Sequence, residues 1–69
     1  MTEYAVIIER GDDGFGAYVP DLPGCVATGS TREDVERLIR EAIVGHVEEL
    51  RRSGEAVPEP RTVASAVEV

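Results

Sequence analysis

Hydrophobic and polar residues along the chain follow two different periods. The first half carries three short apolar stretches, at residues 4–8 (YAVII), 15–19 (FGAYV) and 25–28 (CVAT), each bounded by glycine, aspartate or proline. Stretches of four or five β-branched, aromatic or small residues between such breakers are typical of β-strands. The connections between them are short and turn-like, so we expect these three strands to pair antiparallel.

A helical period replaces this pattern over residues 31–53. Eight residues recur at intervals of three and four and form one apolar stripe: Val35, Leu38, Ile39, Ala42, Ile43, His46, Val47 and Leu50. Ser30 is expected to cap the helix, because Glu33 stands at the capping-box distance from it. Gly54, with Pro58 beyond it, is expected to end the helix.

The predicted helix is longer than a small sheet can cover. At ~1.5 Å per residue it would extend for about 33 Å. Its last turns are therefore expected to form an oligomer interface around His46, Val47 and Leu50.

The last residues, 62–69 (TVASAVEV), alternate valine with smaller or polar side chains and predict a fourth strand. A right-handed crossover through the helix would place this strand parallel to the first one. The sequence thus predicts an α+β fold of element order β-β-β-α-β, with sheet order 3-2-1-4 and one helix on one face. The opposite face would have no cover from this chain, which favours association.

The composition limits the class of protein. A length of 69 residues allows one small domain, residues 1–69, whose thin core favours a homo-oligomer such as a dimer or tetramer. One cysteine excludes an internal disulfide and suits the cytoplasm. No apolar run approaches the roughly 18 residues of a membrane span, and the N-terminus has no basic targeting segment. A cytoplasmic protein without a membrane anchor is expected.

Charge indicates the kind of partner. Fourteen acids against seven basic residues, all of them arginine, give a net charge of -7. A field of this sign repels nucleic acid and attracts a basic protein, although it also serves solubility. The acids expected to face such a partner are Glu9, Asp12 and Asp13, near the first turn. The Asp12-Asp13 pair by itself lacks the spaced oxygen ligands of a calcium loop.

The stretch from Val19 to Thr31 carries most of the backbone constraints. Pro20 and Pro23 exclude helix or central strand, and Gly24 permits a turn. Asp21 lies inside this rigid turn, and two interpretations stay open for it. Its carboxylate either makes a local turn bond or, together with Leu22, is presented to a partner's arginine or lysine.

Two side chains could in principle carry chemistry. His46 lies on the apolar stripe of the helix and is the only histidine, which excludes a histidine-rich metal site. Cys25 begins a strand and has no second cysteine with which to form a metal or redox motif. Packing roles are favoured for both residues. We therefore expect no catalytic residues, no cofactor and no metal site.

Several motifs, in their order and spacing, resemble the HicB-like antitoxin family, also called UPF0150-like. The resemblance runs from Tyr4 to about Arg61. The motifs that carry it are GAYVPDLPGC at 16–25, GSTRE at 29–33, EAI at 41–43, and Gly54 with Pro58 and Pro60. It implies the partial ribonuclease H-like fold of the HicB N-terminal domain. It also implies an antitoxin that binds a small basic HicA-like mRNA interferase toxin and covers the toxin's catalytic histidine.

The resemblance also shapes the alternatives. Relatives that regulate their own transcription carry a further C-terminal DNA-binding domain. The present sequence matches a short form without one, so direct DNA binding is not expected. Short relatives without a known partner also exist, and the alternative is an orphan homo-oligomer with a scaffold or other protein-binding role. An enzyme would require Asp21, Cys25 and His46 to converge, which their separation along the chain disfavours.

Overall fold

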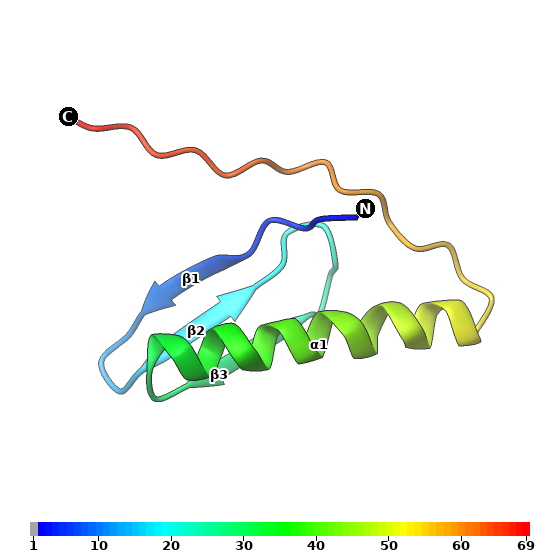
Figure 1. Ribbon diagram of the computed structural model, residues 1–69, viewed down its shortest axis with the longest axis horizontal. Helices are drawn as coiled ribbons and strands as arrows, with labels where there is room; N and C mark the ends of the chain where they lie inside the picture. Colours follow the sequence, from blue (N-terminus) through cyan, green and yellow to red (C-terminus); the bar gives the residue numbers. More distant parts are fainter. Residues whose placement is uncertain (1) are drawn as a thin grey trace.

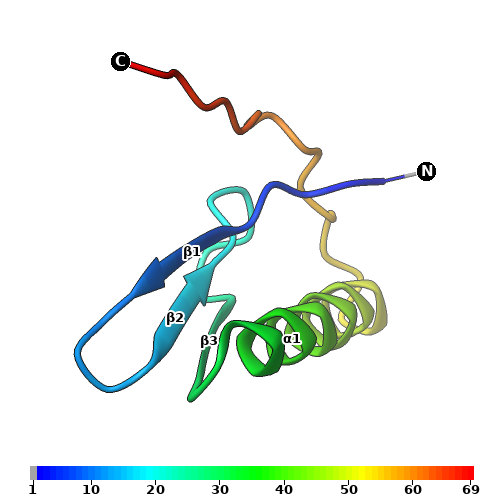
Figure 2. The ribbon, with the colours of Figure 1, turned by 60° about the vertical axis from the view of Figure 1, so that its left-hand side comes forward.

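The chain forms a three-stranded antiparallel sheet with one long helix on one face. The computed structural model describes residues 2–69 (Figure 1). The elements follow in the order β1 (Ile7–Arg10), β2 (Phe15–Tyr18), β3 (Val26–Gly29) and α1 (Arg32–Arg52). β2 pairs with both neighbours, so the sheet order is β1-β2-β3. Seen nearly along its axis, α1 lies beside the sheet and covers one face of it (Figure 2).

The predicted three antiparallel strands and the helix are confirmed, but the fourth strand is wrong. Within residues 2–69 the sheet has three strands, and the order is β-β-β-α instead of β-β-β-α-β with sheet order 3-2-1-4. Residues 62–69 are irregular, and all but Thr62 are exposed. Figure 1 shows this segment running away from the sheet toward the C-terminus.

The residues before this segment explain why it does not join the sheet. Pro58 and Pro60 have no N–H to donate to a strand ladder. The next two N–H groups, of Arg61 and Thr62, donate to the carboxylate of Asp21 at 2.8 and 2.9 Å. Of residues 58–62, only Glu59 therefore has a backbone N–H that could pair with the edge of β1.

β1 also begins later than predicted, at Ile7 instead of Tyr4. Ile7 stands opposite Tyr18, the last residue of β2. Continuing this register would place Ala5 opposite Pro20, which has no N–H, while the Val19 N–H donates to the carbonyl of Cys25 at 3.2 Å. The rigid turn thus ends the ladder on both strands.

The sheet has an inner face toward α1 and an outer face away from it. On the inner face, Ile8, Ala17 and Ala27 are paired across the three strands. Ala17 belongs to the core, and the other two pack against it. The buried core residues come from the sheet, the rigid turn and the helix, and they are Ala17, Val19, Leu22, Cys25, Val35 and Ile39. The inner face of the sheet thus packs on α1.

Capping residues set the ends of α1. Thr31, and not Ser30 as predicted, is the N-cap: its side chain accepts the N–H of Asp34 at 3.0 Å. Both residues are good caps, and the extended backbone at Thr31 (φ -127°, ψ 163°) decides between them. At the other end, Gly54 adopts φ 74° as predicted, and its N–H donates to the carbonyl of Arg51 at 3.1 Å.

Candidate protein-binding surface

The outer face of the sheet carries a row of apolar side chains, of which Ile7 is half-buried and Tyr18 and Val26 are exposed. Ile7, Tyr18 and Val26 stand opposite one another across β1, β2 and β3. None of the three belongs to the core or to the apolar side chains packed against it. Tyr18 is 42% exposed and Val26 is 64% exposed. The row arises from the alternation of strand side chains, which puts every second residue on the face away from α1.

Next to this row lies a shallow hollow. Glu9, Gly16 and Thr28 form the second line of residues on the outer face. Gly16 has no side chain, and a hollow of about 480 Å³ lies around it and the β1–β2 turn. The hollow is lined by Gly11, Asp13, Gly14, Phe15, Gly16, Thr28, Gly29 and Ser30. The outer face thus combines an apolar row with a hollow at the turn end of the sheet, whose lining is half glycine.

Acidic side chains border the hollow. Asp12 and Asp13 lie in the turn between β1 and β2, which is closed by the Gly11 N–H donating to the Gly14 carbonyl at 2.8 Å. Both aspartates and Glu9 are exposed. The three acids predicted to face a partner therefore gather at one end of the sheet, and their contact with a partner stays a prediction.

Asp21 is engaged within the chain. It accepts the N–H groups of Arg61 and Thr62, and also the Thr62 hydroxyl at 2.8 Å. The pKa of Asp21 is lowered, first by the Arg61 N–H, then by the Thr62 N–H and the Thr62 hydroxyl, because all three bonds favour the charged carboxylate. Neither of the two interpretations of this residue included the C-terminal segment. Leu22, grouped with Asp21 in the sequence, is 0% exposed.

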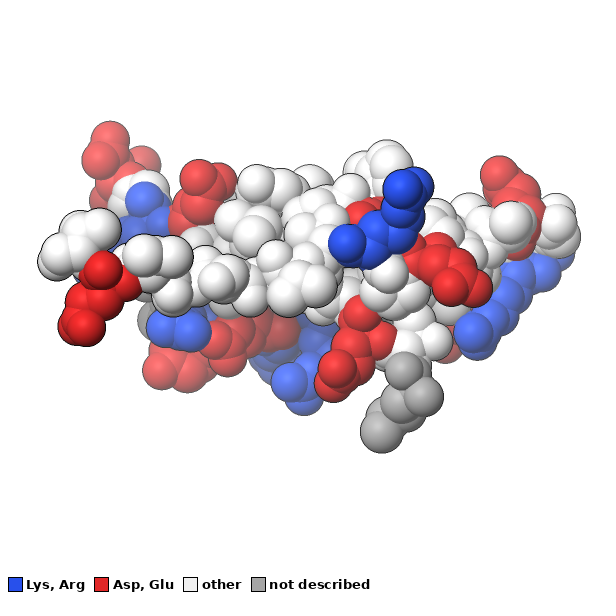
Figure 3. Space-filling view, turned by 90° about the horizontal axis from the view of Figure 1, so that it is seen from above, with Lys and Arg blue, Asp and Glu red and all other residues white. Residues whose placement is uncertain are grey.

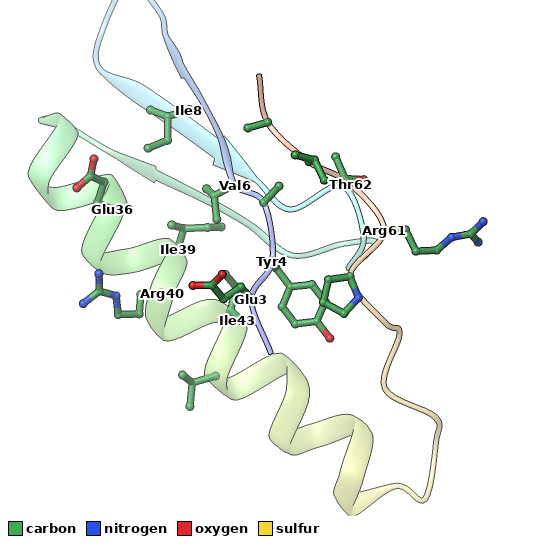
Figure 4. Close-up of a pocket in the computed structure, with 15 residues that line it drawn as sticks. Glu3, Tyr4, Val6, Ile8, Glu36, Ile39, Arg40, Ile43, Arg61 and Thr62 are labelled. Carbon is green, nitrogen blue, oxygen red and sulfur yellow. The ribbon is translucent and has the colours of Figure 1, made fainter. Parts of the chain in front are cut away.

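A second and larger hollow lies between β1, α1 and the C-terminal segment (Figure 4). It measures about 890 Å³, and its walls include Tyr4, Val6 and Ile8 on one side and Ile39 and Ile43 on the other. The C-terminal segment forms the third wall. The Tyr4 hydroxyl donates to the carbonyl of Pro58, so this wall is bonded to the N-terminal residues as well as to Asp21.

The last turns of α1 are only partly covered. His46, Val47 and Leu50 are all half-buried, and Val47 packs against the core. The oligomer interface predicted for these three residues stays a prediction.

The three residues considered for catalysis, Asp21, Cys25 and His46, lie in different parts of the fold. Cys25 is buried among core side chains, and burial raises the pKa of its thiol, which keeps the sulfur protonated. Asp21 bonds the C-terminal segment, and His46 lies on the far half of α1. None of the three lines either hollow described above. Among residues 2–69, no group of three His, Cys, Asp or Glu side chains is placed to hold a metal ion.

Charge is distributed unevenly over the surface. In the view from above Figure 1, uncharged side chains cover much of the surface, and acidic and arginine side chains stand around its margins and in a group just right of its middle (Figure 3). On α1 the arginines lie beside acids: Arg32 contacts Glu36 at 2.9 Å, and Arg37 contacts Glu41 at 3.3 Å. The helix that the structure describes is 21 residues long but not apolar enough to cross a membrane.

The fold and this surface define a class: a small acidic sheet-and-helix protein with one uncovered sheet face. The model of a family described as the HicB-like antitoxin of bacterial toxin-antitoxin systems matches residues 4–69. The chain belongs to this HicB-like antitoxin family, and the resemblance found in its sequence motifs is confirmed.

Individual relatives agree with this assignment. The chain is 39% identical over 57 residues to a UPF0150 protein of Thermoplasma acidophilum, covering 81% of this chain and 83% of that protein. It is 33% identical over 60 residues to an uncharacterised 14.9 kDa protein of Haemophilus phage HP1, covering 87% of this chain but only 45% of the phage protein. Among solved structures, a chain of the HicA3 and HicB3 toxin-antitoxin complex matches with a TM-score of 0.73 and 33% identity, over 86% of this chain and 70% of that one.

Proposed function

We propose that this protein is the antitoxin of a HicAB-type type II toxin-antitoxin system. In this role it binds a small basic mRNA interferase toxin in the cytoplasm and masks it, acting as a ribonuclease inhibitor without chemistry of its own. The observation that carries the proposal is the likeness to a chain of the HicA3 and HicB3 complex, at 33% identity and a TM-score of 0.73.

The charge of the molecule supports the same role. A net charge of -7 raises the rate at which a basic protein meets this chain and orients the encounter. The exposed acids Glu9, Asp12 and Asp13 are available for such an encounter. Charge of this kind governs specificity and association rate more than final affinity, so apolar contacts must supply much of the binding free energy.

Co-expression tests the proposal. The chain should be expressed with the small basic protein encoded beside its gene, and growth and complex formation should be measured. We expect the basic protein alone to arrest growth, and co-expression to restore growth and yield a complex that co-purifies. The absence of such a neighbour, or growth arrest that this chain does not relieve, would contradict an antitoxin role.

The second candidate function is that of an orphan homo-oligomer with a scaffold role. It is favoured by the exposed valines of the C-terminal segment, Val63 at 87% and Val67 at 81%, which a second copy could cover. Light scattering on the purified chain would distinguish the two. A stable dimer or tetramer that binds no basic protein supports the orphan role.

A further inference from the structure

We propose that the outer face of the sheet is the surface on which the basic partner docks. The outer face consists of the apolar row Ile7, Tyr18 and Val26 and the polar line Glu9, Gly16 and Thr28. This inference rests on the proposed function, because it assigns a surface to the partner named there.

Apolar exposure on this face supports the assignment. Ile7, Tyr18 and Val26 are aligned by the strand register, so they present one continuous strip instead of scattered side chains. Tyrosine at the centre of such a strip is a typical source of binding energy, because its ring buries a large area at little entropic cost. The strip lies on the face opposite α1, and none of its residues contributes to the core.

Charge identifies the occupant as a basic protein. Glu9 is the only charged strand residue on the outer face, and Asp12 and Asp13 lie at its edge. Among residues 2–69, none of these three acids forms an ion pair, whereas the ion pairs present all lie on α1. Arg10 stands opposite Phe15, which packs against the core, and therefore projects toward the inner face. A partner's lysine or arginine would meet acids with no competing cation on the same face.

The same charges disfavour a second copy of this chain. Two copies docked by their outer faces would bring both Glu9 side chains and both acidic turns to one interface, with -7 on each molecule. A basic partner gains electrostatic energy at the position where a second copy would lose it. The hollow around Gly16 adds a concave site into which a side chain of the partner can fit.

Gly16 allows this face to be blocked without disturbing the fold. A Cβ added at Gly16 meets no atom within 4 Å, and the same is true at Gly45, which is exposed on α1. Gly16→Arg puts a long cation in the middle of the proposed surface. Gly45→Arg makes the same change of charge on the helix and is the matched control.

The test is the affinity of both variants for the small basic protein that co-purifies with the wild-type chain, measured by isothermal titration calorimetry. We expect Gly16→Arg to raise Kd at least about tenfold and Gly45→Arg to change it less than about threefold, since only the first blocks the interface. Tyr18→Ser is a second variant with the same expectation, and circular dichroism verifies that each variant folds.

The outcomes separate this inference from the proposed function. If the wild type binds and neither Gly16→Arg nor Tyr18→Ser weakens binding, the outer face is wrong and the antitoxin role stands. If the wild type binds no basic protein, both are overturned. If the free wild type is a dimer that Gly16→Arg dissociates, the outer face joins two copies and the assignment to a basic partner fails.

Discussion

The two faces of the same three strands differ in composition and in burial. On the inner face, Ala17 is 5% exposed and packs with Ile39 of α1, which is 3% exposed. On the outer face, one residue further along, Tyr18 is 42% exposed and is not among the side chains packed against the core. Both faces carry apolar side chains, so hydrophobicity alone does not distinguish a stabilising residue from one left exposed on the surface. The position of the single helix makes that distinction.

Removing an inner contact should have the largest effect on stability. Ile39→Ala deletes a buried side chain beneath the sheet, and we expect a loss of about 2–5 kcal/mol in the free energy of unfolding. In so small a domain such a loss is a large part of the total. Urea denaturation followed by circular dichroism measures it, with Val44→Ala, 52% exposed on the same helix, as the control. Equal losses for the two variants would contradict the assignment of the inner face.

Two glycines compare the faces directly. A Cβ at Gly29 would meet the backbone nitrogen of Val35 at 2.9 Å, whereas one at Gly16 meets nothing within 4 Å. We expect Gly29→Ala to destabilise the protein by about 1–3 kcal/mol through overpacking. We expect Gly16→Ala to leave stability unchanged or raise it by up to about 1 kcal/mol. Thermal unfolding of both variants checks the difference, and the opposite order would reverse the assignment of the two faces.

A third prediction concerns the C-terminal segment, which adds no strand to the sheet and is bonded to Asp21 instead. The pKa of Asp21 is lower in the folded protein, so the bonds to Arg61 and Thr62 are complete at neutral pH. They should weaken as the pH falls below about 3.9, the ordinary pKa of aspartate, and through the lowered pKa of Asp21. The protection of the two amides against hydrogen exchange, taken relative to the intrinsic rate at each pH, should fall over that range, and in Asp21→Asn at pH 7 already.

Asp13→Asn is the control for this prediction, because Asp13 makes no bond to the segment. Slow exchange at Arg61 and Thr62 in Asp21→Asn would show that another contact holds the C-terminal segment in place.

The smallest effect is expected on the outer face. Val26→Thr replaces a 64% exposed side chain by one of similar shape, and we expect a change within about 0.5 kcal/mol in the free energy of unfolding. Chemical denaturation measures this change. A loss above about 1 kcal/mol would mean that the outer face also carries part of the core.

Some features of the candidate surface could be predicted from the sequence. Glu9, Asp12 and Asp13 were expected to be exposed acids, and the structure gathers them at one end of the sheet. The apolar row of Ile7, Tyr18 and Val26 was missed. The pairing of strand residues depends on register, and only the alternation within residues 15–18 and 26–29 signalled that each strand has a second face.

Local sequence is enough to specify the features that depend on neighbouring residues. Prolines at 20 and 23 and the glycine at 24 specify the turn through restricted or permitted φ angles, and Gly54 ends the helix for the same reason. The period of apolar residues at 35–50 specifies the helix and its buried stripe. These constraints act within a few residues, so they can be read without knowledge of the fold.

The conformation of residues 62–69, in contrast, depends on contacts with residues far away in the sequence. Their alternation is that of a strand, but a strand requires a partner edge and free backbone donors. Asp21, which is 40 residues from Arg61 in the sequence, bonds the N–H groups of Arg61 and Thr62 and fixes where the segment leaves the sheet. A pattern within eight residues contains no information about a carboxylate that far away, which is why a fourth strand was predicted where the structure has an irregular segment.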